Sequence, residues 1–287
     1  MKRVTFINTL GAELVFTNSA PFLLQKFTEN ESVTISSSKS VGQDGATYLE
    51  NTLEPKDISI EFAMIADTEP EFIRLRNLIY KVLSPTLGEG TLIYKDDVNE
   101  RMIKCIINKK PSFSNFNTRV SSGIISLTAN SPFWSTLLET REDVAYWQGD
   151  FEFPLEIPES GMEIGHRVLA EKINLINPGD IDCGIRIEVQ AFGSVVDPVI
   201  TLLNTGEYIK LNKTLAAGDK LTITTTFNNK RVIGTFGGVV VNAFNYIDVD
   251  STFFRLYSGD NLLQYSATSG ENNLDVTIYF LPLYSGV

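Results

Sequence analysis

The sequence predicts a mainly β protein with two domains and one amphipathic helix. Short runs in which apolar and polar residues alternate with period two recur along the chain, bounded by Gly, Pro, Asn and Asp. One segment near residues 69–83 shows helical spacing instead. A chain of 287 residues is long enough for about two domains of ordinary size. We expect an N-terminal β-barrel or sheet domain followed by a C-terminal antiparallel β-sandwich, or jelly roll.

The first domain is expected to cover residues 1–134. Its predicted strands lie at residues 4–7, 14–16, 22–27, 33–36, 58–65, 91–94, 102–108 and 120–128. Pro132 should end the last of these strands, because proline cannot donate to a central ladder. Phe133 and Trp134 follow it and need to be buried, so they are expected to close the domain.

A single helix is predicted within the first domain. Thr68 is a good N-cap, Pro70 lies in the first turn, and Glu71 stands three residues after the cap, which is a capping-box arrangement. Apolar residues then recur at three- and four-residue spacing, at Phe72, Leu75, Ile79 and Val82. This stripe predicts an amphipathic helix that packs on the sheet and ends before Pro85.

Residues 135–150 carry several charged side chains and are expected to connect the two domains. The second domain is expected over residues 151–287, with no helix. Its predicted strands lie at residues 151–157, 170–177, 185–191, 199–203, 208–211, 220–226, 253–257 and 275–280. Short strands at near-regular spacing, separated by turns such as Asn-Pro-Gly and Asn-Thr-Gly, are typical of an antiparallel sandwich.

The most informative stretch is residues 41–62, in which a Gly-Gln-Asp-Gly turn is followed by a polar segment and an alternating strand. The stretch holds no His or Cys, and its acidic residues are spread along an extended segment. A polar, Gly-containing excursion of this length between strands is unusual unless it binds something. We therefore predict an oligomer interface at its tip. The candidate residues are Val41, Gly42, Gln43, Asp44, Gly45 and Ala46.

The net charge of −11 is distributed unevenly. Residues 1–134 hold 14 basic and 15 acidic side chains, which leaves 10 basic and 20 acidic side chains for the rest of the chain. An acidic second half argues against binding to nucleic acid or to anionic surfaces, because both need clustered Lys and Arg. No apolar run approaches the roughly 20 residues that span a bilayer, and none resembles the core of a signal peptide. We expect no membrane segment and no secretion by the signal-peptide route.

The sequence offers little for catalysis, and we expect no catalytic residue, cofactor or metal. The single histidine, His166, excludes two-histidine zinc sites, and no nucleophile elbow, phosphate-binding loop or dinucleotide fingerprint occurs. Cys105 and Cys183 lie far apart in the sequence and are expected to be reduced and buried.

Two features keep other functions open. The carboxylate pairs Glu152 with Glu156 and Asp248 with Asp250 could belong to a glycosidase, although the solvated faces of half-buried strands explain them as well. Aromatic residues of the second half could stack on sugars, although most strand aromatics lie in cores. They are Trp147, Phe151, Phe153, Tyr208, Phe227, Phe236, Phe244, Tyr246, Phe253, Phe254, Tyr257, Tyr265 and Tyr284.

Several of these segments resemble the phage distal tail protein (Dit) family of siphophages and related prophages. In the first half they are residues 43–45, residues 53–58, the capped helix, the strand at residues 102–107, and residues 128–134. In the second half, residues 217–221, 256–261 and 275–286 are similar to the galectin-like C-terminal sandwich of that family. The resemblance covers nearly the whole chain.

The resemblance implies a structural hub of the tail tip or baseplate. Family members form a six-fold ring that joins the tail-tube protein to the tail-associated spike or fibre, and the family has no catalytic residues. The arm that clasps the neighbouring subunit would correspond to residues 36–52. The protein would be assembled in the host cytoplasm and end in the phage tail, without binding membrane or specific nucleic acid sequences. The alternative to a structural hub is a carbohydrate-binding module that binds a neutral host glycan. A wall-degrading hydrolase is the third candidate.

Overall fold

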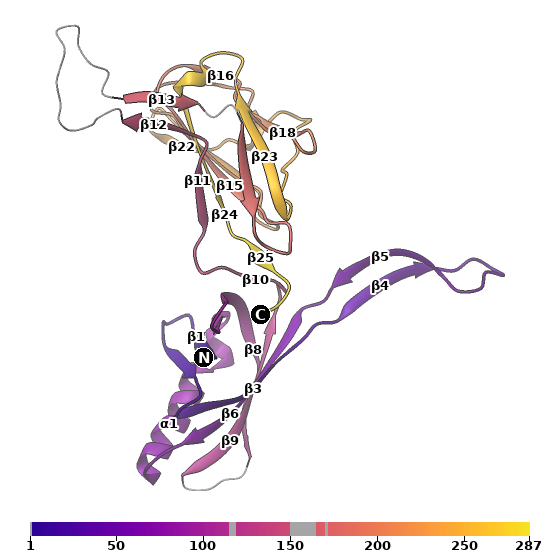
Figure 1. The fold of residues 1–287 in the computed structure, drawn as a ribbon, viewed down its shortest axis with the longest axis vertical. Helices are drawn as coiled ribbons and strands as arrows, with labels where there is room; N and C mark the ends of the chain where they lie inside the picture. The colour runs from indigo at the N-terminus through magenta and orange to yellow at the C-terminus, as the bar shows by residue number, and fades with distance from the viewer. Residues whose placement is uncertain (1, 115–118, 150–164, 170–171) are drawn as a thin grey trace. The chain divides into compact units, whose positions relative to one another are not determined.

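The computed structural model describes residues 2–114, 119–149, 165–169 and 172–287 (Figure 1). The chain divides into two compact units. The first unit contains residues 1–137 and 284–287, and the second contains residues 138–283. The last four residues therefore belong to the same unit as the N-terminal half of the chain.

The first unit is built on an antiparallel sheet with the strand order β2-β1-β7-β8-β9-β6-β3. These strands are β1 (Arg3–Ile7), β2 (Glu13–Phe16), β3 (Phe22–Asn30), β6 (Lys56–Ile65), β7 (Gly90–Lys95), β8 (Glu100–Ser114) and β9 (Val120–Ala129). The short strand β10 (Trp134–Ser135) pairs with β8, and β25 (Leu283–Tyr284) pairs with β10. The edge strands β2 and β3 meet only through a bridge between Thr17 and Leu23, so within the described residues the sheet is open rather than a closed barrel.

The helix α1 (Glu69–Val82) confirms the predicted cap. The Thr68 side chain accepts a hydrogen bond from the Glu71 backbone N–H, and Glu71 Oε2 accepts one from the backbone N–H of Asp67 at 3.0 Å. Phe72, Ile79 and Val82 are buried in the core of the first unit. The helix therefore contributes its apolar stripe to the same core as the sheet.

Alternation along β6 shows how the sequence places this core. Ile58, Ile60 and Phe62 are buried at every second position and share one face of the strand. Phe62 packs against Phe16, with 5.1 Å between the ring centroids, and Trp134 is fully buried in the same cluster. The predicted burial of Trp134 at the end of the domain is confirmed.

The second unit contains two larger antiparallel sheets. The six-stranded sheet has the order β11-β24-β15-β20-β21-β22, and the four-stranded sheet has the order β14-β23-β17-β18. Their strands are β11 (Thr140–Asp143), β14 (Ile173–Asn177), β15 (Ile185–Ala191), β17 (Val199–Leu202), β18 (Glu207–Lys210), β20 (Lys220–Thr224), β21 (Arg231–Phe236), β22 (Val239–Asn242), β23 (Gly259–Ser266) and β24 (Leu274–Phe280). Both sheets contribute to one hydrophobic core, for example through Ile187 and Leu202. This arrangement is a β-sandwich.

Smaller elements complete the two units. Besides the hairpin of β4 (Val33–Ser38) and β5 (Thr47–Leu53), two-stranded sheets are formed by β12 (Ala145–Gly149) with β13 (Gly165–Leu169) and by β16 (Val195–Val196) with β19 (Thr214–Leu215). The described residues also form the 3-10 turns η1 (Pro85–Leu87), η2 (Phe244–Tyr246) and η3 (Glu271–Asn273). Within the described residues, α1 is the one α-helix.

Two local expectations for the second half are wrong. Residues 253–257 were predicted to form a strand, but only Leu256 makes an isolated bridge, to Cys183, while Phe254 packs into the core. Asp248 and Asp250 lie in a turn rather than on a strand face, because Asp248 accepts a hydrogen bond from the Asp250 backbone N–H. In addition, residues 140–143 of the expected connector form β11, which pairs with β24.

Candidate functional site

The feature that the sequence analysis singled out is a long hairpin of the first unit. Strand β4 (Val33–Ser38) pairs with β5 (Thr47–Leu53) in a two-stranded sheet of their own. Figure 1 shows this hairpin projecting away from the rest of its unit. We call residues 33–53 the arm. It is longer than the predicted segment of residues 36–52, because the pairing begins at Val33 with Leu53.

The predicted interface residues lie at the tip of the arm. Gln43 is half-buried, and Val41, Gly42, Asp44, Gly45 and Ala46 are exposed. Gln43 organises the tip, since its backbone N–H donates to Ser40 O, its Oε1 accepts from Ser40 N, and its Nε2 donates to Thr47 Oγ1. Gly42 and Gly45 have positive φ angles of 82° and 79°, which glycine adopts at little cost.

Apolar side chains are exposed along the arm. The register pairs Val33 with Leu53, and Ile35 follows Val33 by two residues, so these three side chains share one face. Ile35 is 65% exposed, and Val33 and Leu53 are also exposed. A single two-stranded hairpin is marginally stable in water, and exposed apolar residues on it favour burial against another surface.

The base of the arm is held by a buried cluster. Lys56, the first residue of β6, is only 2% exposed, and its Nζ lies 3.2 Å from Glu29 Oε2 and 3.8 Å from Glu31 Oε2. The same Nζ donates to the backbone oxygen of Ser285. The indole N–H of Trp134 donates to Glu29 Oε2 at 2.8 Å. We call these residues the Lys56 cluster.

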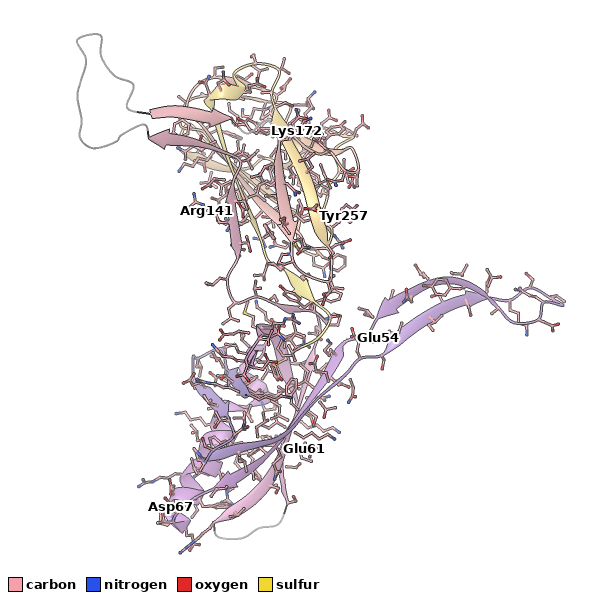
Figure 2. The ribbon with its side chains drawn as sticks, viewed as in Figure 1. Glu54, Glu61, Asp67, Arg141, Lys172 and Tyr257 are labelled. Atoms are coloured by element: carbon pink, nitrogen blue, oxygen red, sulfur yellow. The ribbon has the colours of Figure 1, made fainter. Side chains whose placement is uncertain are left out.

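Two further hydrogen bonds join the strands where the arm leaves the sheet. The backbone N–H of Glu54 donates to Ser32 O at 2.9 Å, and Thr34 Oγ1 donates to Glu54 Oε1 at 2.6 Å. Glu54 is labelled at this point in Figure 2. Both chain segments that enter the arm are therefore tied to each other beside the Lys56 cluster.

Sequence reasoning missed the Lys56 cluster, although a signal was present. Lys56 precedes Ile58, Ile60 and Phe62 at two-residue spacing, which places it on the buried face of β6. A lysine on a buried face requires acidic partners. The partners, however, come from β3 and from residues more than 200 positions away, and local pattern does not identify them.

The residues considered for chemistry do not form a catalytic arrangement in the described part of the chain. Cys105 and Cys183 are free and buried as expected, and burial raises the pKa of each thiol to about 12. A hydrogen bond donated by Asn212 is the main cause that lowers the pKa of Asp248. The pair Glu152 and Glu156 lies outside the described residues.

Among the described residues, no group of three or more His, Cys, Asp and Glu side chains is placed to hold a metal ion. No described helix combines the length and apolar character that crossing a bilayer demands. His166 lies in β13, in register with Gln148.

The aromatic residues of the second unit divide between core and surface. Phe254 and Tyr265 are buried, whereas Phe227, Phe244 and Tyr257 are exposed. The positions Trp147, Phe151 and Phe153 lie outside the residues whose side chains are described. Phe192 is also exposed but was not among the predicted candidates, although it directly follows β15 and continues its alternation onto the exposed face.

Comparison with protein families gives a match for each half of the chain. Residues 10–129 match the family described as phage tail protein RIFT-related domain. Residues 178–284 match the family described as siphovirus-type tail component, C-terminal domain. The chain belongs to the siphophage distal tail (Dit) family. The resemblance seen in the sequence is thereby confirmed.

Solved structures show the same fold as this Dit protein. The Dit protein of phage SPP1, described as a paradigm of the hub adsorption apparatus in phages that infect Gram-positive bacteria, aligns with a TM-score of 0.68 at 13% identity and covers 98% of both chains. A chain of the phage P2 baseplate, in its activated conformation with Ca, aligns over 100% of both chains with a TM-score of 0.51 at 13% identity. No curated protein matches the sequence.

Proposed function

We propose that this Dit protein assembles into a ring of six copies, in which the arm of each copy binds the neighbouring copy. The observation that carries the proposal is the arm itself, which within the described residues pairs only with itself and exposes Val33, Ile35 and Leu53 on one face. Contact between an arm and a different surface of the next copy is heterologous, and such contacts generate a ring when the rotation closes.

The ring would serve as the hub of the tail tip and join the tail-tube protein to the tail-associated spike or fibre. Membership of the Dit family supports this role, since the family consists of structural tail components. In this proposal the protein acts without catalysis, is assembled in the host cytoplasm and becomes part of the virion tail. Neither membrane nor a specific nucleic acid sequence is a partner.

Deleting residues 41–46 tests the ring. Ser38 pairs with Thr47, so the deletion leaves Lys39 and Ser40 as a two-residue turn and preserves the register of the hairpin. Multi-angle light scattering of the wild type should give six times the chain mass of 31.9 kDa, and the deletion variant should give a folded monomer. The control Val98→Ser, at an exposed residue outside the arm, should assemble like the wild type. Equal masses for wild type and deletion variant would refute the assignment.

Binding of a neutral glycan is a second candidate function, favoured by the exposed rings of Phe227, Phe244 and Tyr257 in the second unit. Glycan-array screening of the wild type, followed by Phe244→Ala on any ligand found, tests it. Binding that survives the loss of each of these rings would exclude a sugar site at Phe227, Phe244 and Tyr257.

A further inference from the structure

Strand β22 ends the six-stranded sheet of the second unit and leaves an open edge. The Ala243 backbone N–H donates to Val232 O at 2.9 Å, so these two residues form a hydrogen-bonded pair. Hydrogen-bonded and non-hydrogen-bonded pairs alternate along an antiparallel ladder, and the register of β21 with β22 therefore shows which residues of β22 bond to β21. Val239 and Val241 consequently bond to β21, whereas Val240 and Asn242 direct their backbone N–H and C=O groups away from the sheet. No strand in the described part of the chain pairs with this edge.

Apart from its short length of four residues, the open edge lacks the usual protection against pairing. Edge strands commonly carry Lys, Pro or a bulge that prevents another strand from adding. The sequence of β22 is Val-Val-Val-Asn, and its ladder to β21 is regular. Val240 is 69% exposed, and the neighbouring Ile233 and Phe244 are 40% and 48% exposed. These three side chains contribute to a groove of about 460 Å³.

The charge at this groove is opposite to that of the rest of its unit. Lys230 and Arg231 line it, and neither forms an ion pair with any described residue. Residues 220–247 contain three basic side chains and no Asp or Glu, within a half of the chain that holds 20 acidic side chains. The Lys230 Nζ lies 5.7 Å from the ring centroid of Phe253, which stacks on Phe244.

We propose that the outer edge of β22 binds an extended segment of another protein by strand addition. The segment would pair with the backbone of Val240 and Asn242, place alternate apolar side chains in the groove, and carry acidic residues beside Lys230 and Arg231. A second copy of this chain is a poor occupant, because its own β22 region offers no acidic residue and its second unit repeats the same net acidic charge. The proposal concerns the second unit and is independent of ring formation.

A synthetic peptide tests the proposal on the full-length protein. The probe is a fluorescein-labelled Glu-Glu-Val-Thr-Val-Thr-Val peptide, and binding is measured by fluorescence anisotropy. The wild type should bind it about tenfold more tightly than the matched Lys-Lys-Val-Thr-Val-Thr-Val peptide, as one charge-assisted contact predicts. The double variant Lys230→Glu and Arg231→Glu should reverse this preference. Equal binding of both peptides by the wild type would refute the acidic specificity.

Backbone pairing needs its own variants. Val240→Pro removes an N–H that points away from β21, so it should leave the sheet folded and weaken binding about tenfold. Val240→Thr keeps that N–H and should bind within about threefold of the wild type. A probe peptide that is N-methylated at alternate residues should bind the wild-type protein with about tenfold lower affinity. This measurement uses only the wild-type protein, so it does not depend on whether any variant folds. Unchanged affinity for the N-methylated peptide, or displacement of the probe by neutral glycans, would overturn strand addition.

Discussion

Lys56 shows how a single residue can organise a functional element. Its ammonium is buried between Glu29 and Glu31, and it also holds the backbone oxygen of Ser285. Burial of a charge is costly unless partners satisfy it, and removal of one partner leaves the others buried without compensation. Lys56 is the first residue of β6 and follows the arm in the chain. Loss of one of its partners would therefore destabilise the structure at the base of the arm.

Replacing Lys56 with Met should destabilise the protein strongly. The change leaves Glu29 partly buried without its cation, and loss of one partner of a buried pair costs about 3–5 kcal/mol of unfolding free energy. The matched control is Lys95→Met, which breaks the exposed pair with Glu100 and should cost less than about 1 kcal/mol. Urea unfolding of both variants measures the difference. Similar losses would show that the Lys56 cluster contributes no more than a surface pair.

The two thiols should be unreactive in the folded protein. Burial raises the pKa of Cys105 and of Cys183 to about 12, which favours the protonated thiol below that pH. At pH 8 roughly one thiol in ten thousand would be the reactive thiolate. Titration with a thiol reagent should detect no thiol in native protein and two in 6 M urea. Rapid labelling of native protein would contradict the burial of one or both residues.

At the scale of elements, local signals account for α1 and only partly for the arm. The cap at Thr68 and the apolar stripe lie within one segment, so the sequence alone predicts where α1 begins and which face it buries. In the arm, the turn at residues 42–45 marks the tip, but strand β5 is exposed throughout and shows no alternation between buried and exposed residues. Its pairing with β4 became visible only in three dimensions.

One face of the arm should matter more than the other for assembly. Ile35→Lys places a charge among Val33 and Leu53, and burial of that charge in a subunit contact would be unfavourable. Thr52→Lys is the control, because Thr52 is exposed and lies on the opposite face, in register with Thr34. Sedimentation velocity should show loss of the oligomer for Ile35→Lys and retention for Thr52→Lys. Identical behaviour of the two variants would remove the distinction between the faces.

At the scale of the whole molecule, alternation and turn residues were sufficient to predict two β units, but not every strand. The strand expected at residues 253–257 failed because Phe254 and Leu256 follow core packing rather than a ladder. Strand β11 consists of polar and charged residues, so its sequence shows no apolar alternation. Arg141 and Asp143 in this strand form an ion pair at 3.0 Å. Its partner β24 lies more than 130 residues later, beyond the reach of local pattern.

The second unit should fold by itself if β11 is included. A fragment of residues 138–283 keeps β11 and the buried Val144, whereas a fragment of residues 151–287 lacks both. The loss of an edge strand and of a core side chain should cost a few kcal/mol, as for other large core deletions. Calorimetry should therefore give a cooperative transition for the longer fragment at a higher temperature than for the shorter one. A higher transition temperature for residues 151–287 would contradict this boundary.

The last four residues of the chain lie in the first unit, where Ser285 O accepts from Lys56, Arg101 stacks at 3.7 Å on the Tyr284 ring, and Arg101 also donates to Gly286 O. The sandwich is therefore inserted into the sequence of the first unit, and two chain segments connect the units instead of one. A protease cut between residues 137 and 138 would therefore leave the contacts of residues 284–287 with the first unit, including those with Lys56 and Arg101, to hold the two fragments together.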